Sequence, residues 1–196
     1  MNVRYYLRAR WRAPRDIPGL KPLGQFDLDL YESESAWPHA FFTDRLWRYA
    51  STSQLTVKAR TGDRQPFAAI EIDERELPTG AQQLSSGLKG RVISPATHYR
   101  LTTNTTSFEV TASAAGTIVL SEPYYPDEFR LTVNGRPCNY FRINHAYKGI
   151  HLDAPGVYRV EFAYWPHTLT LSFILAGGGA GGAGWNGLDS VPAEFA

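Results

Sequence analysis

Hydrophobic and polar residues alternate through most of the stretch from Gly116 to Trp165. In residues 129–133, and again in residues 157–165, every second residue is hydrophobic or aromatic. This period of two is typical of half-buried β-strands. Asn134-Gly135 directly follows the first run and favours the tight turn of a hairpin, because both of its positions readily adopt positive φ. The pattern therefore predicts antiparallel strands.

Shorter strand-like runs upstream extend this prediction to a sandwich. They cover residues 91–93, 98–103 and 107–112, and turn-forming residues separate them. About seven strands at intervals of roughly 8 to 12 residues are typical of a β-sandwich of the jelly-roll or immunoglobulin-like type. We therefore expect a mainly β fold, in which residues 90–166 form an antiparallel β-sandwich core. The side chains expected between its two sheets are those of Tyr99, Leu101, Phe108, Val110, Ile118, Leu120, Leu131, Val133, Phe141, Ile150, Val160 and Phe162.

Residues 1–89 indicate a small α+β N-terminal subregion packed on the sandwich. Residues 3–11 alternate between an apolar and a basic face, which predicts a strand. The arginines that follow this pattern could contact lipid headgroups or a phosphate, but the solvated face of an edge strand explains them more simply, because charge commonly protects such edges. They are Arg8, Arg10, Arg12 and Arg15.

Elements between residues 26 and 89 are less regular. Asp27-Leu28-Asp29 matches the Asp-x-Asp pattern of some metal sites, but its spacing on a strand predicts two solvent-facing carboxylates. Thr43-Asp44 could start one helical turn. Residues 53–60 alternate like a strand, yet Ser53 and Gly62 suit the two ends of a helix. We expect a strand over residues 67–72 and a loop over residues 73–89.

The composition of the chain excludes some classes of function and partner, but it does not indicate a particular activity. The chain has 196 residues, of which 43% are hydrophobic, so it can form one sizeable core. Its formal net charge of +1 offers no field for nucleic acid, and we predict no nucleic-acid partner. The single cysteine, Cys138, excludes an internal disulfide, and we expect it to be a small buried hydrophobic residue.

No motif specifies a reaction. The five histidines lack the spacing of a metal site, and the sequence has no nucleophile elbow, phosphate loop or dinucleotide fingerprint. Glu122 and Asp127 are a weak candidate pair for hydrolysis, because neighbouring acids on a turn are usually solvated. We therefore predict no catalytic residue, no metal and no cofactor.

Aromatic residues offer the sharpest candidates for binding. Tyrosine and tryptophan present an apolar ring with a polar edge, and pyranose rings stack on such surfaces. Tyr124 and Tyr125 stand in a proline-flanked loop, and Trp165 ends the last alternating run. Binding residues concentrate on loops at the ends of a rigid scaffold. Tyr124, Tyr125 and Trp165 are accordingly the candidate glycan contacts.

Several short motifs resemble the C-terminal extracytoplasmic segment of YfhO-like bacterial membrane proteins. The C-terminal ones are Ser121-Glu-Pro-Tyr-Tyr-Pro126, Val133-Asn134-Gly135, Tyr140-Phe-Arg-Ile-Asn144, Gly149-Ile-His-Leu-Asp-Ala-Pro-Gly156 and Val160-Glu-Phe-Ala-Tyr-Trp-Pro166. The N-terminal ones are Asn2-Val-Arg-Tyr-Tyr-Leu7 and Leu30-Tyr-Glu-Ser-Glu-Ser-Ala-Trp-Pro-His-Ala-Phe-Phe42. The resemblance spans roughly residues 2 to 175 and favours the helix, rather than the strand, over residues 53–60.

The resemblance implies that this chain has a non-catalytic role. Such proteins are multi-spanning and are similar to GT-C glycosyltransferases, which use polyprenyl-phosphate sugars, but the loop that usually carries the catalytic acid of those enzymes has no counterpart here. It implies a module on the extracytoplasmic face of a bacterial membrane, with a membrane domain of the same or a neighbouring protein and an envelope glycan as partners. No signal peptide follows Met1, so we expect upstream sequence to direct export.

The C-terminal residues 167–196 depart from the family pattern. An apolar run from Leu169 to Ala176 leads into the glycine-rich residues 177–184, where the family would have a last membrane helix of about 20 apolar residues. We expect a truncated membrane-anchor remnant followed by a flexible tail. The alternative function is a free-standing carbohydrate-binding or structural β-sandwich.

Overall fold

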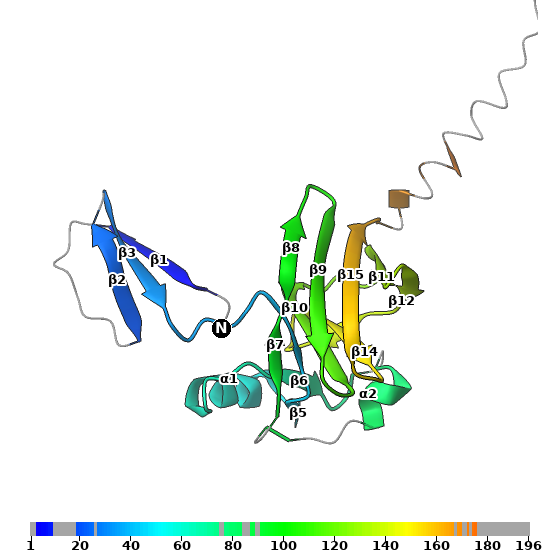
Figure 1. Ribbon diagram of the computed structural model, residues 1–196, viewed down its shortest axis with the longest axis horizontal. Helices are drawn as coiled ribbons and strands as arrows, with labels where there is room; N and C mark the ends of the chain where they lie inside the picture. The colour runs from blue at the N-terminus through cyan, green and yellow to red at the C-terminus, as the bar shows by residue number, and fades with distance from the viewer. Residues whose placement is uncertain are drawn as a thin grey trace, which may run out of the picture.

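Antiparallel β-sheets make up most of the protein, and two small helices accompany them (Figure 1). The computed structural model describes residues 3–9, 19–25, 27–74, 77–83, 87–88, 91–166, 168–169, 172 and 174–175. The expected mainly β, sandwich-like fold class is therefore confirmed.

Two five-stranded sheets face each other in the main body. One has the order β12-β11-β15-β9-β8, and its strands are β8 (Thr97–Leu101), β9 (Thr105–Ala112), β11 (Phe129–Val133), β12 (Arg136–Cys138) and β15 (Gly156–Tyr164). The other has the order β13-β14-β10-β4-β7, and its strands are β4 (Ala40–Thr43), β7 (Ile93–Pro95), β10 (Gly116–Pro123), β13 (Phe141–Ile143) and β14 (Tyr147–Leu152). The expected turn at Asn134-Gly135 joins β11 to β12, with both residues at positive φ.

The main core lies between these two sheets. Alternate residues of β9, β10 and β15 point into it, as the period of two predicts. The buried members of this cluster are Ala40, Phe42, Phe108, Val110, Ala112, Ile118, Leu120, Leu131, Ile150, Leu152, Val160 and Phe162. Phe141 was expected here, but it belongs to a second cluster on the outer side of the β4-containing sheet.

Two expected core residues lie at the surface instead. Leu101 is 67% exposed at the end of edge strand β8, and Tyr99 is 38% exposed. The Tyr99 hydroxyl donates a hydrogen bond to Glu122, so its ring must stay near the rim of the sandwich. The prediction for both residues was wrong because alternation does not distinguish a central strand from an edge strand.

The second core cluster joins the sandwich to a small β-α-β unit. Strands β5 (Leu46–Tyr49) and β6 (Ala68–Glu71) pair in parallel, and helix α1 (Thr52–Thr61) connects them. The helix confirms the prediction for residues 53–60, although its N-cap is Ser51, whose hydroxyl accepts from the backbone N–H of Gln54.

Two local predictions in this region are corrected. Residues 43 and 44 do not start a helical turn, because Thr43 ends β4 and its hydroxyl accepts from the backbone N–H of Arg45. The expected loop over residues 73–89 contains the short helix α2 (Thr79–Gln83). Strand β4 lies inside the β10-containing sheet, so the sandwich also uses residues from the region assigned to the N-terminal subregion.

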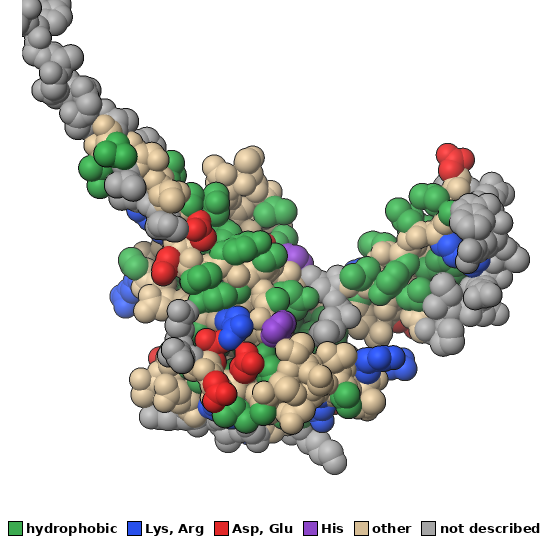
Figure 2. Space-filling model, turned by 180° about the vertical axis from the view of Figure 1, so that it is seen from behind, with side chains coloured by type: hydrophobic (Ala, Val, Ile, Leu, Met, Phe, Trp, Pro, Cys, Tyr) green, Lys and Arg blue, Asp and Glu red, His purple; other side chains and the backbone are tan. Residues whose placement is uncertain are grey.

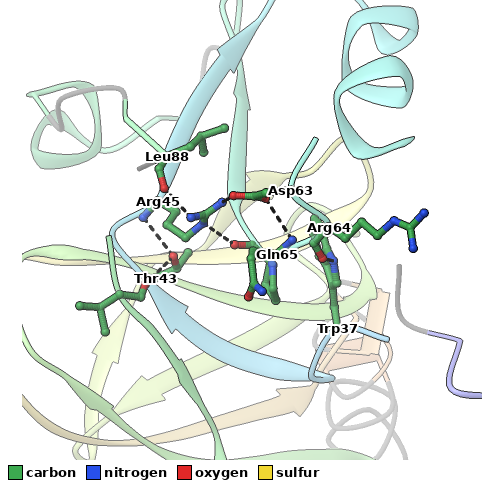
Figure 3. A network of polar contacts seen from close by, with 9 residues as sticks. Trp37, Thr43, Arg45, Asp63, Arg64, Gln65 and Leu88 are labelled. Atoms are coloured by element: carbon green, nitrogen blue, oxygen red, sulfur yellow. Dashed lines mark hydrogen bonds and ion pairs between the residues drawn. The ribbon is translucent and has the colours of Figure 1, made fainter. Parts of the chain in front are cut away.

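A buried arginine fastens the segments of this unit to one another (Figure 3). The Arg45 guanidinium donates to the carbonyl of Pro66 at 3.0 Å, to the carbonyl of Leu88, and to the Asp63 carboxylate at 2.6 Å. These partners come from the connection between α1 and β6 and from the stretch before β7. One side chain thus links two segments that lie far apart in the sequence.

A three-stranded sheet lies to one side of the main body (Figure 1). Its order is β1-β3-β2, and its strands are β1 (Tyr5–Ala9), β2 (Leu20–Gln25) and β3 (Leu28–Ser33). Its apolar face is solvent-exposed, with Leu7 at 67% exposure, whereas Asp29 is buried opposite Arg8. Asp27 is exposed, as expected, but the prediction that Asp29 faces solvent is wrong. Arg10, Arg12 and Arg15 lie outside the described residues.

The C-terminal predictions fall mostly on residues that the structure does not describe. After Pro166 only residues 168–169, 172 and 174–175 are described, so neither the expected anchor remnant nor the glycine-rich tail is tested. Among the described residues, no helix has the length and hydrophobicity to cross a membrane.

Candidate functional site

The loop between β10 and β11 is the centre of the candidate site. Hydrogen bonds to two neighbouring segments of the chain hold this loop in place. The backbone N–H of Tyr124 donates to the carbonyl of Ala146 at 2.7 Å. The hydroxyl of Tyr140 donates to the carbonyl of Tyr125 at 2.6 Å. The rings of Tyr124 and Tyr140 meet edge to face with centroids 5.5 Å apart. The two prolines, Pro123 and Pro126, further restrict this loop.

A first pocket of about 540 Å³ opens on one side of the loop. Strands β11 and β12 form its floor and edge. Its wall combines aromatic rings with one carboxylate, one guanidinium and one side-chain amide. The lining residues are Tyr124, Asp127, Phe129, Arg130, Leu131, Thr132, Pro137, Cys138, Asn139 and Tyr140.

A second pocket of about 640 Å³ opens on the other side of the same loop. The turn between β13 and β14 and the residues after β6 complete it. The lining residues are Asp73, Glu74, Pro123, Tyr124, Tyr125, Pro126, Arg142, His145 and Ala146. Both pockets fall in the range of volumes typical of small-molecule sites.

The three candidate glycan contacts lie in different positions relative to the two pockets. Tyr124 lines both pockets and is half-buried, whereas Tyr125 lines the second pocket and is 55% exposed. Trp165 lines neither pocket. Its ring lies 4.0 Å from the guanidinium carbon of Arg130, which lines the first pocket, so Trp165 acts on the site through Arg130.

Each pocket contains a residue with a left-handed backbone. Asp127 in the first pocket has φ 59°, and His145 in the second has φ 73°. Non-glycine residues are uncommon in this region and persist where the surroundings fix them. Asn144 fixes the turn at His145, because its buried amide accepts from the N–H of Ala69 at 2.6 Å and donates to the carbonyl of Phe67 at 3.1 Å.

Ion pairs hold the charged wall of the second pocket. Arg142 donates to Glu74 at 2.8 Å and to Glu71 at 3.1 Å. The Glu74 hydrogen bond raises the pKa of Arg142, so this guanidinium stays charged. Because of these two ion pairs, Arg142 is already engaged by protein carboxylates. The face of the molecule seen in Figure 2 carries acidic and basic side chains gathered beside a histidine.

Behind the loop, Glu122 and Lys148 form a polar cluster within the sandwich. Lys148 donates to Glu122 at 2.9 Å, and Glu122 also accepts from the hydroxyls of Tyr99 and Thr106. Burial opposes ionisation of Glu122, but contacts with His39, Lys148 and Thr106 prevail and lower its pKa to about 2. Burial lowers the pKa of Lys148, although Glu122 counteracts this shift.

This cluster argues against the candidate hydrolytic pair. A general acid needs a raised pKa, whereas Glu122 is held ionised and its oxygens already accept hydrogen bonds. Asp127 lies apart from this cluster on the exposed wall of the first pocket. The two carboxylates therefore have separate roles.

Cys138 corrects another prediction. It is exposed, not buried, because β12 is the edge strand of its sheet and Cys138 lines the open first pocket. Among the residues that the structure describes, no three histidine, cysteine, aspartate or glutamate side chains are grouped closely enough to hold a metal ion.

Sequence reasoning missed most of the polar residues of the site. Arg142 meets Glu71 and Glu74 across 71 and 68 positions of the chain, so no local pattern connects them. Asp73 was assigned to a loop without a function. Of the site residues, only the aromatic and proline residues at 123–126 could be recognised as binding candidates from the local sequence.

Comparison of the chain with protein-family models, curated proteins and solved structures finds no match. A function is therefore inferred from the residues of the site themselves.

Proposed function

We propose that this chain is a non-catalytic carbohydrate-binding β-sandwich, which serves as the extracytoplasmic module of a YfhO-like membrane protein of cell-envelope glycan assembly. The single observation that carries the binding role is the position of Tyr124, which forms the common wall of two adjoining pockets. A chain of sugars needs such a row of neighbouring sites, whereas a compact ligand needs one.

The chemistry of the two walls suits a glycan. Tyrosine rings offer apolar faces on which pyranose rings stack, and Tyr124, Tyr125 and Tyr140 line these pockets. Carboxylate, amide and guanidinium groups supply acceptors and donors for sugar hydroxyls, as Asp127, Asn139 and Arg130 do in the first pocket.

The absence of turnover is part of the proposal. The ionised, hydrogen-bonded Glu122 is unsuited to general acid chemistry, and Asp127 is the one carboxylate among the described residues that line its pocket. We expect the purified chain to bind glycans without cleaving or transferring them. Sugar transfer by this chain alone would contradict the proposal.

The membrane context rests on the resemblance of the sequence motifs. One of these motifs, Ser121–Pro126, covers the end of β10 and the first residues of the loop beside the two pockets. The reading frame upstream of Met1 tests this part separately. An in-frame series of hydrophobic helices would support a membrane module, whereas a stop codon and a ribosome-binding site would favour the alternative of a free-standing carbohydrate-binding or structural sandwich.

A glycan array followed by calorimetric titration tests the binding role. Wild-type protein is compared with Tyr124→Ala and Tyr125→Ala, and Tyr5→Ala serves as control because Tyr5 is as exposed as Tyr125 but lies on β1. We expect the Tyr124→Ala variant to lose binding most, by about tenfold or more, since one stacked ring contributes on the order of 1 kcal/mol and Tyr124 serves two pockets. A folded wild-type protein that binds no glycan would leave only a structural role.

A further inference from the structure

We infer that the two pockets beside Tyr124 are adjoining subsites for a glycan whose sugars carry a positively charged amine, an inference that rests on the proposed function. The carboxylates that line them set this preference. Neutral sugars and anionic sugars are the competing ligand classes.

The second pocket has more negative than positive charge. Arg142 contributes one positive charge, and it is shared by Glu71 and Glu74. Asp73 also lines this pocket, is exposed and forms no ion pair with any residue that the structure describes, whereas Glu71 is not among the residues that line it. Asp73 and Glu74 therefore place two carboxylates beside one guanidinium, and a cationic group on the ligand would relieve this imbalance.

The first pocket offers a second exposed carboxylate without excess positive charge. Asp127 makes no ion pair within the described part of the chain. Among the described residues that line this pocket, Arg130 is the only cation, and its guanidinium stacks on the ring of Trp165. A uronic acid or phosphate could pair with one arginine in the first pocket, but the excess of carboxylates in the second pocket would repel it. An anionic polymer therefore fits the pair of pockets poorly.

The position of Tyr124 makes the two carboxylates part of one site. Tyr124 lines both the pocket of Asp127 and the pocket of Asp73, and each pocket is large enough for a sugar ring. Successive sugars of one chain could occupy both sides of the ring. Each subsite then places one aspartate beside one sugar, where an ammonium group donates up to three hydrogen bonds.

The test uses three β-1,4-linked tetrasaccharides that differ mainly in one substituent. They are a glucosamine tetramer, an N-acetylglucosamine tetramer and cellotetraose, titrated into the full chain by calorimetry at about pH 6.5 and low salt. We expect the glucosamine tetramer to bind about fivefold or more tightly than the other two, since one exposed charge pair contributes up to about a factor of five.

Variants that remove one negative charge test whether the aspartates of the two pockets cause the preference for the amine-bearing glycan. Asp73→Asn and Asp127→Asn should each reduce the ratio of glucosamine-tetramer affinity to cellotetraose affinity by about threefold to fivefold. Asp153→Asn is the control, because Asp153 is exposed and lines neither pocket but pairs with His151. Raising the salt concentration should also reduce the preference, because screening weakens charge pairs and not ring stacking.

The outcomes separate this inference from the proposed function. Equal binding of the charged and neutral tetrasaccharides, or a preference that survives both aspartate variants, would overturn the amine preference while glycan binding itself would stand. Failure of all three tetrasaccharides would also overturn it, and a positive glycan array would then still support the binding role. Failure of the array as well would overturn both.

Discussion

Tyr140 and Tyr125 are joined by a hydrogen bond of 2.6 Å, in which the phenolic hydroxyl of Tyr140 donates to the backbone carbonyl of Tyr125. The same hydroxyl accepts from the N–H of Phe129 at 3.3 Å. Tyr140 thus links the start of β11 to the loop that separates the two pockets. Together with the hydrogen bond from Tyr124 to Ala146, this side chain holds the loop and the ring of Tyr124 in position.

Replacing Tyr140 by phenylalanine tests this dependence. Tyr140→Phe keeps the ring against Tyr124 but removes the hydroxyl, so we expect a loss of about 1 kcal/mol in the free energy of unfolding. We also expect weaker glycan binding, because the loop is less constrained. Urea denaturation measures the first effect and calorimetric titration the second.

Tyr158→Phe is the matched control for this variant. The Tyr158 hydroxyl also donates to a backbone carbonyl, that of Ala154, at 2.8 Å, but it lines neither pocket. The control should lose similar stability and keep glycan affinity. Equal affinity in Tyr140→Phe and wild type would show that the loop does not need this bond.

The fold was largely predictable because alternation is a local property. Residues 129–133 and 157–165 alternate as expected and pair with each other, and Asn134-Gly135 forms the expected turn. Whether a strand lies at an edge depends on the topology of the sheet, which no local pattern carries. Leu101 and Cys138 were therefore expected to be buried, although both lie on edge strands.

The candidate site was predictable only in part, for the same physical reason. The aromatic, proline-flanked residues 123–126 are contiguous, and the sequence indicated them. The polar wall is assembled from distant segments: Asp73 and Glu74 follow β6, while Arg142 lies on β13. Contacts at that separation follow from the packing of the β-α-β unit on the sandwich and not from spacing.

Glu122 should make the protein sensitive to acid. Its pKa of about 2 lies below its ordinary value of 4.5, so the folded state favours the ionised form. The stabilisation is fully present above about pH 5 and is lost as the pH falls toward 2, when the carboxylate becomes protonated. A shift of this size corresponds to about 3 kcal/mol at neutral pH. Urea denaturation at several pH values between 2 and 7 should show this decline.

Glu122→Gln separates this contribution from that of other carboxylates. At neutral pH the variant should lose about 3 to 5 kcal/mol, because it leaves the buried ammonium of Lys148 without its partner charge. The difference from wild type should shrink as the pH falls toward 2. Glu109→Gln is the control, because its pair with the exposed Arg159 contributes about 1 kcal/mol or less. A constant difference at all pH values would contradict the assignment.

Arg45→Lys tests whether the buried guanidinium holds residues 63–67 and residues 87–88 together. A lysine has one nitrogen and cannot contact Pro66, Leu88 and Asp63 at once, so buried acceptors lose their donors. We expect a loss of about 2 to 4 kcal/mol in unfolding free energy, and faster hydrogen exchange in residues 63–67 and 87–88.

Arg159→Lys is the control for this substitution. Arg159 also pairs with a carboxylate, but its side chain is 80% exposed, so a lysine should cost no more than about 0.5 kcal/mol. Similar losses in the two variants would mean that the Arg45 contacts do not depend on the planar guanidinium.

Gly116 and Gly156 begin the facing strands β10 and β15, and they should respond to alanine in opposite ways. A Cβ atom on Gly116 would lie 2.6 Å from the ring of Phe42 and 2.8 Å from the carbonyl oxygen of Thr43. Because Phe42 is fully buried and Thr43 contributes backbone, neither can move cheaply. We expect Gly116→Ala to lose about 1 to 3 kcal/mol through overpacking.

At Gly156 the same methyl group would meet only the ring of Tyr158, at an ordinary 3.4 Å. Gly156→Ala should therefore be neutral or stabilise by up to about 1 kcal/mol, because alanine reduces the freedom of the unfolded chain. Urea denaturation of both variants measures the contrast directly. Equal effects would show that β4 and β10 can separate at Gly116, and the close approach of these two strands would then not be a fixed feature of the sandwich.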